Sequence, residues 1–384
     1  MPITPNRPAH PADDAIGHAI TPVVIDLTDG SDPVPTLHAA LRTQGFVAIR
    51  NSQVSAALGQ RALASARAYF AQSAQVKTAD AYSDTNLNFG FQGLETEALD
   101  PKQALDEADR KEAFTMRSLN NRTQLPEITD KTVKQFHPKH PPFGATAAEL
   151  FEACNNTALE LLTLIARALK SEPDTFAAFH TGENMTLRYL HYPDGAHAFD
   201  AKNRGNQKKM PQLGAGAHTD YGTITLLFSD GVAGLQLYDV SDNTQDPADR
   251  LDDLDFLSAS ANKSAIAGTK RTTKGEGRWR NVVVAPGDIL VNTGDLMTLW
   301  SNGLYPSTLH RVLPRTEQPD RYSIAFFVDP DSKTKVSPLP SCIEQRAGSE
   351  KNPENSMVER TATNSVIAGE HIQARIEASQ RALA

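Results

Sequence analysis

The spacing of hydrophobic residues changes near residue 183, and the change divides the chain into two parts. Before that point, apolar residues recur every three or four positions over 54–72 and 146–170, which predicts two amphipathic helices. Thr146 and Glu149 have the spacing of a capping box, which marks the expected start of the second helix. We expect both apolar faces to pack in the core; they consist of Val54, Leu58, Ala62, Ala66 and Phe70 in the first helix and of Leu150, Cys154, Ala158, Leu161, Ile165 and Leu169 in the second.

Short hydrophobic runs separated by turn residues dominate the chain after residue 183. Examples are TLRYLHYP, GTITLLF, GLQLYDV, DILVNTGD and RYSIAFFVDP. Runs of this length and spacing predict the strands of a β barrel or of a double-sheet β fold. Residues 21–27 and the end of 41–51 predict two earlier strands. Residues 239–280 interrupt the series with charged and small polar residues, and they form either a solvated loop insertion or a substrate lid.

The composition narrows the class of protein. With 39% hydrophobic and 22% charged residues, the chain resembles an ordinary globular protein. The net charge of −8 and the absence of a long basic run argue against a nucleic-acid partner. No run of about 18 apolar residues indicates a membrane span. The proline-rich N-terminus lacks the apolar core of a signal peptide, and Cys154 and Cys342 are expected to be free thiols, so we expect a cytoplasmic protein.

The stretch GAGAHTDYGTITLLF at 214–228 places two strong polar groups beside an apolar run. Residues two apart in a strand face the same side, so His218 and Asp220 are expected to project together. An imidazole and a carboxylate on one face can chelate a cation or form a structural hydrogen-bonded pair. A single His-x-Asp sequence leaves both interpretations open.

Two later segments and one earlier segment add groups that favour the metal. The segment STLHRVLP supplies His310, and two histidines with one carboxylate form a facial triad that suits iron(II) and leaves positions open for a chelating cosubstrate and dioxygen. In RYSIAFF, Arg321 and Ser323 share a strand face, and a guanidinium beside a hydroxyl is a suitable receptor for a carboxylate. Tyr192, in LHYP, could supply a further hydroxyl.

In this order, the segments resemble the iron(II)/2-oxoglutarate-dependent dioxygenases of the isopenicillin N synthase-like family. The resemblance covers roughly residues 21–375 and is carried by VIDL, QGFVAIRN, NFGFQG, LRYLHYP, AGAHTDYGTITLLF, GLQL, APGD, NTGDLMTLWSNGLYPSTLHRV and RYSIAFF. HTDYGTITLLF and LWSN look closest to a fungal and bacterial branch that includes thymine hydroxylases. Leu190 departs from the family pattern, because many relatives carry there an asparagine that contacts the cosubstrate.

The resemblance implies a mainly β fold with flanking helices, a double-stranded β-helix or jelly roll. Together with the strand pattern, it implies a flexible tail at 1–20 and a single dioxygenase domain at 21–384. That domain would be helix-rich to about residue 182, with a jelly-roll core at about 183–330 that carries the insertion 239–280. A helical tail would follow the core.

The same resemblance implies the cofactors and their ligands. Carried over to this sequence, iron(II) is held by His218, Asp220 and His310, and the far carboxylate of 2-oxoglutarate meets Arg321 and Ser323, with Tyr192 assisting. Such an enzyme uses dioxygen to oxidise, most often to hydroxylate, a small molecule, and it releases succinate and carbon dioxide.

Several further residues are candidates for substrate contact. Arg188 shares a strand face with Tyr192 and serves either an internal salt bridge or a substrate oxygen. Phe327 shares the face of Arg321 and either stacks on a flat substrate or fills the core. The full set of candidates is Arg188, Tyr221, Phe327, Asn88, Phe89 and Phe91.

Three other polar residues are expected to lie away from the site. His191 faces the side of its strand opposite to Tyr192 and is expected to be structural or exposed. Asp295 is expected at a turn or strand end, and His371 at the surface of the tail helix.

Two alternatives to a 2-oxoglutarate oxygenase stay open at this point. One is an iron oxidase of the same fold that does not use 2-oxoglutarate. The other is a non-redox metal-binding jelly-roll protein, against which the pairing of Arg321 and Ser323 argues because such a protein needs no carboxylate receptor beside its metal. For an oxygenase of this family we expect a small, flat or carboxylate-bearing substrate. We expect no nucleic-acid or membrane partner, and a monomer or a weak homo-oligomer.

Overall fold

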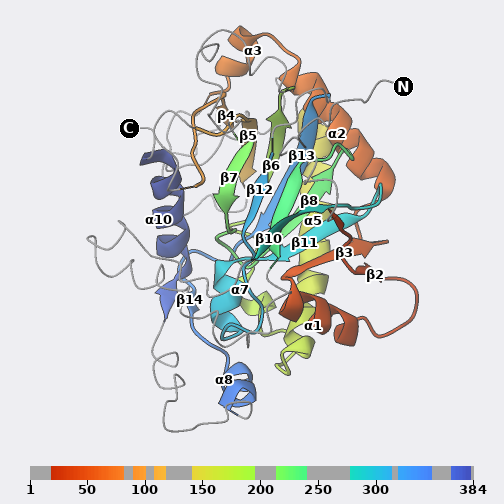
Figure 1. The fold of residues 1–384 in the computed structure, drawn as a ribbon, viewed down its shortest axis with the longest axis vertical. Coiled ribbons are helices and arrows are strands. Elements are labelled where there is room, and N and C mark those ends of the chain that lie inside the picture. Colours follow the sequence, from red (N-terminus) through yellow and green to blue (C-terminus); the bar gives the residue numbers. More distant parts are fainter. Residues whose placement is uncertain are drawn as a thin grey trace, which may run out of the picture.

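A computed structural model shows a chain built around two facing β-sheets, with helices on the outside (Figure 1). The structure describes residues 19–81, 90–100, 108–117, 141–194, 213–239, 277–313, 319–347 and 365–381.

The two sheets differ in size. Within the described residues, the larger sheet contains, in spatial order, β2 (Val24–Asp26), β3 (Phe46–Arg50), β11 (Ile289–Thr293), β8 (Ile224–Ser229), β13 (Arg321–Val328), β6 (Thr186–Tyr192), β5 (Glu112–Arg117) and β4 (Gly90–Gln92). The smaller sheet contains β1 (Ala19–Ile20), β10 (Arg278–Val282), β9 (Leu235–Asp239), β12 (His310–Val312) and β7 (Ala215–His218). A short antiparallel pair joins β14 (Lys335–Val336) to β15 (Val366–Ile367).

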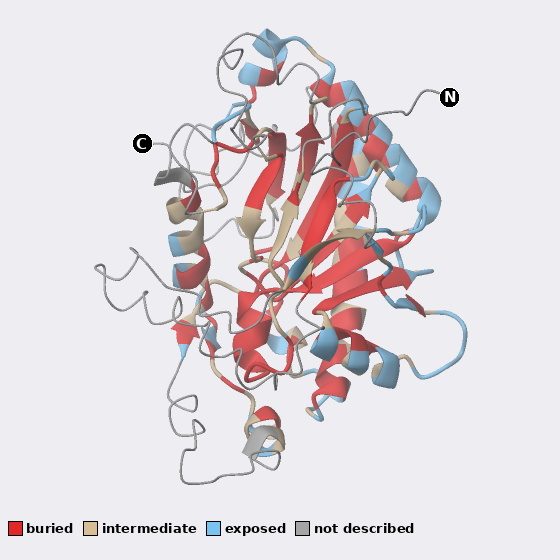
Figure 2. Cartoon of the chain, viewed as in Figure 1, coloured by how far each residue is buried: buried red, intermediate tan, exposed pale blue. Residues whose placement is uncertain are grey.

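Three helices cover the outer face of the larger sheet. α2 (Ala56–Phe70) and α5 (Pro141–Ala168) pack against each other and against β13, and α1 (Val34–Thr43) packs against α5 and β3. Figure 1 shows α5 passing behind the strands, and Figure 2 shows that α2 is exposed on its outer side and buried toward the sheet. Among the described residues, the other helical elements are α3 (Ala74–Thr78), η1 (Ala177–Phe179), α7 (Asp295–Trp300), α8 (Pro340–Ala347) and α10 (Ala368–Arg381).

Strict alternation along β13 separates the two faces of the larger sheet. Tyr322, Ile324, Phe326 and Val328 belong to the apolar core that the sheet shares with the helices. The intervening residues Arg321, Ser323, Ala325 and Phe327 line a cavity on the other side of the sheet. Because successive side chains in a strand point to opposite faces, one strand supplies both a packed core and the wall of a site.

The two predicted helices exist, but one of them begins elsewhere. α2 begins after Ser55, whose hydroxyl accepts the backbone N–H of Leu58. α5 begins at Pro141, so the predicted capping box at Thr146 and Glu149 is wrong; proline suits a first helical turn, and Glu149 instead pairs with Arg61 at 2.6 Å. All the apolar positions predicted for the second helix are buried.

The N-terminal half of the chain contributes strands to both sheets, in addition to its helices. β2 to β5 extend the larger sheet, and β1, at the end of the expected flexible tail, pairs in parallel with β10. Most of the expected insertion 239–280 lies outside the described residues. Its two ends are neighbours, because Asp239 of β9 and Arg278 of β10 are Cα partners.

No helix among the described residues combines the length and the apolar character needed to cross a bilayer.

Candidate active site

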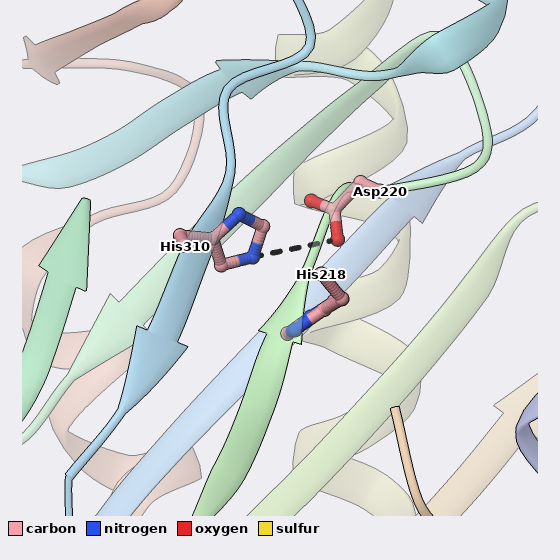
Figure 3. Close-up of side chains that lie close together, drawn as sticks. All are labelled: His218, Asp220 and His310. Atoms are coloured by element: carbon pink, nitrogen blue, oxygen red, sulfur yellow. Dashed lines mark ion pairs between the residues drawn. The ribbon is translucent and has the colours of Figure 1, made fainter. Parts of the chain in front are cut away.

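Three side chains able to hold a metal ion converge where β7 and β12 lie side by side (Figure 3). His218 ends β7, His310 begins β12, and the two residues are Cα partners in an antiparallel pair. Their ring centroids are 4.3 Å apart, and Nε2 of His310 lies 3.7 Å from Oδ1 of Asp220. The ligand atoms of all three residues lie within 4.8 Å of one another.

The convergence of His218 and Asp220 has a different cause from the expected one. β7 ends at His218, so strand alternation does not orient Asp220. Instead, the segment that follows β7 is anchored on the start of α7: the carbonyl of Asp220 accepts the N–H of Asp295 at 2.8 Å, and the carbonyl of Gly222 accepts the N–H of Leu296 at 3.0 Å. The side chain of Asp220 is therefore positioned by a tertiary contact.

Hydrogen bonds orient all three side chains. Nδ1 of His218 lies 2.7 Å from the carbonyl of Gly216, and Nδ1 of His310 lies 3.0 Å from the carbonyl of Thr308, which leaves both Nε2 atoms for a metal. Burial, followed by the neighbouring His310, lowers the pKa of His218 to about 3, so this imidazole is neutral and can coordinate. The donor set therefore fits the two-histidine, one-carboxylate site of iron(II) oxygenases.

Two polar residues that the sequence analysis missed support Asp220. Oδ2 of Asp220 accepts hydrogen bonds from the hydroxyl of Thr225 and the amide of Asn292, each at 2.6 Å. Thr225 and Asn292 are themselves Cα partners on β8 and β11. The available signal was an asparagine in the otherwise apolar strand ILVNT, because a buried amide needs a partner.

Removing this support is expected to weaken metal binding without abolishing it. In Asn292→Leu or Thr225→Val, Oδ2 of Asp220 loses a donor and the carboxylate is less firmly held, so we expect iron(II) affinity to fall about 10–100-fold. Titration with iron(II) under anaerobic conditions measures this change. An affinity equal to that of the unmodified protein in both variants would show that Asp220 needs no such support.

A buried arginine marks the second part of the site. Arg321 is 5% exposed; its Nε donates to the carbonyl of Val232 at 3.2 Å, and one terminal nitrogen donates to the hydroxyl of Ser323 at 3.2 Å. Its guanidinium lies 4.9 Å from the centre of the Tyr192 ring. Among the described residues, no carboxylate forms an ion pair with Arg321, and a buried guanidinium in this state is a receptor for an anion.

A cavity of about 130 Å³ connects these two parts. The cavity is lined by the candidate metal ligands His218, Asp220 and His310. It is also lined by Tyr192, Arg321 and Ser323. Three of the expected substrate residues, Arg188, Tyr221 and Phe327, also line it. Leu190 lies in the wall as well, so an apolar side chain occupies the position where many relatives carry asparagine.

The expectation for the N-terminal aromatic residues fails at one position. Phe91 lies on the helix side of β4, 6.3 Å from the ring of Tyr69, in the apolar core and not in the cavity wall. Its neighbour Gln92 faces the cavity side and meets Arg188. The reason is strand alternation, which turns adjacent residues of β4 to opposite faces. Asn88 and Phe89 lie outside the described residues.

Of the two alternatives expected for Arg188, the structure shows the internal salt bridge. Its guanidinium lies 3.0 Å from Oε2 of Glu97 and 2.5 Å from Oε1 of Gln92, while it also lines the cavity. Lys111 pairs with the same Glu97 at 3.0 Å and with Asp109 at 2.5 Å. Burial alone would raise the pKa of Glu97, but Arg188 and Lys111 hold it well below its usual range. The internal salt bridge is therefore present, and it neutralises Arg188 within the cavity wall.

The C-terminal helix completes the wall. Ile372 and Ile376 of α10 line the cavity, and Arg375 of the same helix lies 4.7 Å from the ring centre of Tyr221 and donates to the hydroxyl of Thr219 at 3.2 Å. His371 is only 3% exposed and lies 3.7 Å from Asp295, so its expected surface position is wrong. His371 and Arg375 of α10 both face the buried carboxylate of Asp295, each at 3.7 Å.

Two family models match this chain. A model of the 2OG-Fe(II) oxygenase superfamily matches residues 245–330, which include His310, Arg321 and Ser323. A model of the N-terminal region of non-haem dioxygenases in morphine synthesis matches residues 23–140.

Relatives and solved structures agree with these matches. Clavatol oxidase claD of Penicillium crustosum is 27% identical over 367 residues, which cover 91% of this chain and 90% of that protein. The 2-oxoglutarate-Fe(II) type oxidoreductase hxnY of Emericella nidulans is 28% identical over 330 residues, covering 83% and 80%. The crystal structure of the full-length Neurospora crassa thymine-7-hydroxylase with α-KG and thymine superposes with a TM-score of 0.66 at 22% identity, covering 94% of this chain and 96% of that one. The predicted jelly roll with flanking helices is thereby confirmed.

Proposed function

Because this chain belongs to the iron(II)- and 2-oxoglutarate-dependent dioxygenases, we propose that the cavity between its two sheets is the active site in which it oxidises a small molecule. The observation that carries the proposal is the meeting of two receptors in one cavity. The triad of His218, Asp220 and His310 lies at one part of it, and Arg321, which has no carboxylate partner among the described residues, lies at another.

In this proposal iron(II) and the far carboxylate of 2-oxoglutarate bind to different side chains of the cavity. Nε2 of His218, Nε2 of His310 and Oδ1 of Asp220 hold iron(II). Arg321 and the hydroxyl of Ser323 bind the far carboxylate of 2-oxoglutarate, and Tyr192 fixes the guanidinium by lying against it. When bound, iron(II) and 2-oxoglutarate supply the oxidising chemistry: dioxygen is consumed, 2-oxoglutarate is decarboxylated to succinate, and the substrate is oxidised, in the usual case by hydroxylation.

The apolar side chains between the two receptors exclude water. Phe46 packs edge-on to His310 at 5.9 Å, and Leu190, Leu227 and Val312 line the same cavity. A wall of this kind strengthens the charge-assisted contacts of Arg321 and protects the oxidant from wasteful side reactions. The remaining task of the protein is to place one C–H bond of the substrate near the metal.

Binding of both cofactors can be tested without knowledge of the substrate. We expect 2-oxoglutarate to produce a visible charge-transfer band when it is added anaerobically to the iron(II)-loaded protein, because it chelates the metal while Arg321 holds its other end. Treatment with EDTA should remove the band, and added iron(II) should restore it. Exposure to air should then yield succinate.

The same measurement separates the alternatives. An oxidase that uses no 2-oxoglutarate would bind iron(II) and give no band, and a non-redox metal protein would give neither a band nor succinate. Either result would contradict the proposal.

Three further properties stay predictions. We propose a cytoplasmic, monomeric or weakly self-associating enzyme that consists of one catalytic domain. Both cysteines are buried and unbonded, which agrees with a reducing compartment. Size-exclusion chromatography with light scattering measures the oligomeric state.

A further inference from the structure

The strand that carries His218 lies at an edge of the smaller sheet. β7 pairs with β12 on one side, and no described strand pairs with it on the other. An edge strand leaves backbone N–H groups without partners in the sheet, and a buried N–H group needs an acceptor. The position of His218 therefore depends on what covers this free edge of β7.

The side chain of Asp109 covers the free edge. It is buried, at 1% exposure, and its Oδ1 accepts the N–H of Gly216, a buried residue of β7, at 2.8 Å. The next residue, Arg110, donates its backbone N–H to the carbonyl of Leu213 at 2.9 Å. Two hydrogen bonds therefore tie the segment that leads into β5 of the larger sheet to β7 and the residues just before it.

Gly216 connects Asp109 to the metal site, because its carbonyl orients His218. Nδ1 of His218 lies 2.7 Å from this carbonyl, so the imidazole folds back along its own strand. The N–H of the same residue is held by Asp109. Fixing this N–H restrains β7 at the residue whose carbonyl sets the direction of the His218 ring.

Asp109 is itself held in place on its other oxygen. Oδ2 lies 2.5 Å from Nζ of Lys111 and accepts the N–H of Leu99 at 3.2 Å, which leaves Oδ1 for Gly216. Burial raises the pKa of the Asp109 carboxyl, and Lys111 opposes this shift. The contact with Gly216 does not depend on the outcome, because a carboxyl oxygen accepts a hydrogen bond in either protonation state.

We propose that Asp109 is a positioning residue for the metal centre: by accepting the N–H of Gly216 at the free edge of β7, it directs Nε2 of His218 toward the metal. The inference rests on the proposed function and adds a residue that is not itself a metal ligand. Partners that orient a histidine through its second nitrogen strengthen metal binding. Only His218 depends on Asp109, because His310 is oriented by the carbonyl of Thr308.

Two double variants that differ at one position test this role. Asp109→Asn/Lys111→Met keeps an oxygen for the N–H of Gly216, and Asp109→Leu/Lys111→Met removes it. Each variant loses one negative and one positive charge, and Glu97 keeps its ion pair with Arg188 at 3.0 Å. Titration with cobalt(II) alone measures metal affinity. We expect the leucine variant to bind cobalt(II) about 10–100-fold more weakly than the asparagine variant, which should bind like the unmodified protein.

Proton NMR of the cobalt(II)-loaded protein separates positioning from general damage. The exchangeable Nδ1–H of each coordinated imidazole gives a strongly shifted signal, because the unpaired electrons of cobalt(II) act on it, so we expect two such signals. In the leucine variant one signal, that of His218, should shift and exchange faster with water, while that of His310 stays unchanged. In the matched control Asp331→Leu, whose carboxylate accepts from Thr181 outside the cavity wall, cobalt(II) affinity and both signals should be unchanged.

Equal cobalt(II) affinities of the two double variants would overturn the inference, and so would a change in both imidazole signals or in neither. If circular dichroism shows that the leucine variant does not fold, the asparagine variant decides alone: unmodified affinity supports the acceptor role, and weakened affinity contradicts it. Two shifted signals in the unmodified protein keep this test separate from the proposed function. Their absence would contradict the metal site itself, and the role of Asp109 with it.

Discussion

Replacing Asp220 by alanine is expected to remove iron(II) binding and, with it, all succinate formation, while the protein still folds. The substitution deletes the one anionic ligand of the triad and leaves the donors Thr225 and Asn292 without their acceptor. Loss of a metal ligand weakens iron(II) binding more than loss of the hydrogen bonds that support this ligand. We therefore expect iron(II) affinity to fall by more than about 100-fold. Anaerobic iron(II) titration and a succinate assay measure the two effects.

A matched substitution separates the metal site from general damage. Asp174→Ala removes an exposed carboxylate that makes no side-chain hydrogen bond or ion pair with any described residue, and it should leave both iron(II) affinity and succinate formation unchanged. Circular dichroism should show the same folded spectrum for both variants. If Asp220→Ala bound iron(II) as tightly as the unmodified protein, the triad would not be the metal site.

Replacing Arg321 by lysine is expected to raise the KM for 2-oxoglutarate about 10–100-fold, with little effect on iron(II) affinity. Lysine keeps the positive charge but loses the planar fork, and it cannot contact Val232, Ser323 and the cosubstrate together. It also loses the contact of the guanidinium with the Tyr192 ring, whose centre lies 4.9 Å away. The KM for the substrate should change less than the KM for 2-oxoglutarate.

The control for this variant is Arg278→Lys, at an exposed position at the start of β10. It should leave the KM for 2-oxoglutarate unchanged. An unchanged KM in Arg321→Lys would mean that the carboxylate binds elsewhere in the cavity. A loss of iron(II) binding in the same variant would point to damage of the fold and not to a role in cosubstrate binding.

The two variants test different receptors in one cavity, so their effects should be separable. Asp220→Ala acts on the metal, and Arg321→Lys acts on the far end of the cosubstrate. In the lysine variant, a high concentration of 2-oxoglutarate should restore the charge-transfer band. In Asp220→Ala, no concentration of 2-oxoglutarate should restore it, because the metal is absent.

The local sequence pattern by itself determined on which face of its strand a residue lies. The alternation in RYSIAFFV placed Arg321, Ser323 and Phe327 on one face of β13, as the structure shows. The same rule placed His191 on the face opposite to Tyr192, where it pairs with Glu112 and stacks on Tyr322. Each of these expectations needed only the strand repeat of two.

Tertiary structure decided the contacts between distant residues that neither the local pattern nor the family resemblance had brought together. Asp220 lies beyond the end of β7 and is positioned by α7, and its supports Thr225 and Asn292 come from two different strands. His371 is buried where α10 meets Asp295, and Glu97 neutralises Arg188 from a segment about ninety residues earlier. Such partners depend on sheet order and on the packing of helices, which hydrophobic periodicity does not encode; periodicity specifies the face of an element, and only the assembled fold specifies its neighbour.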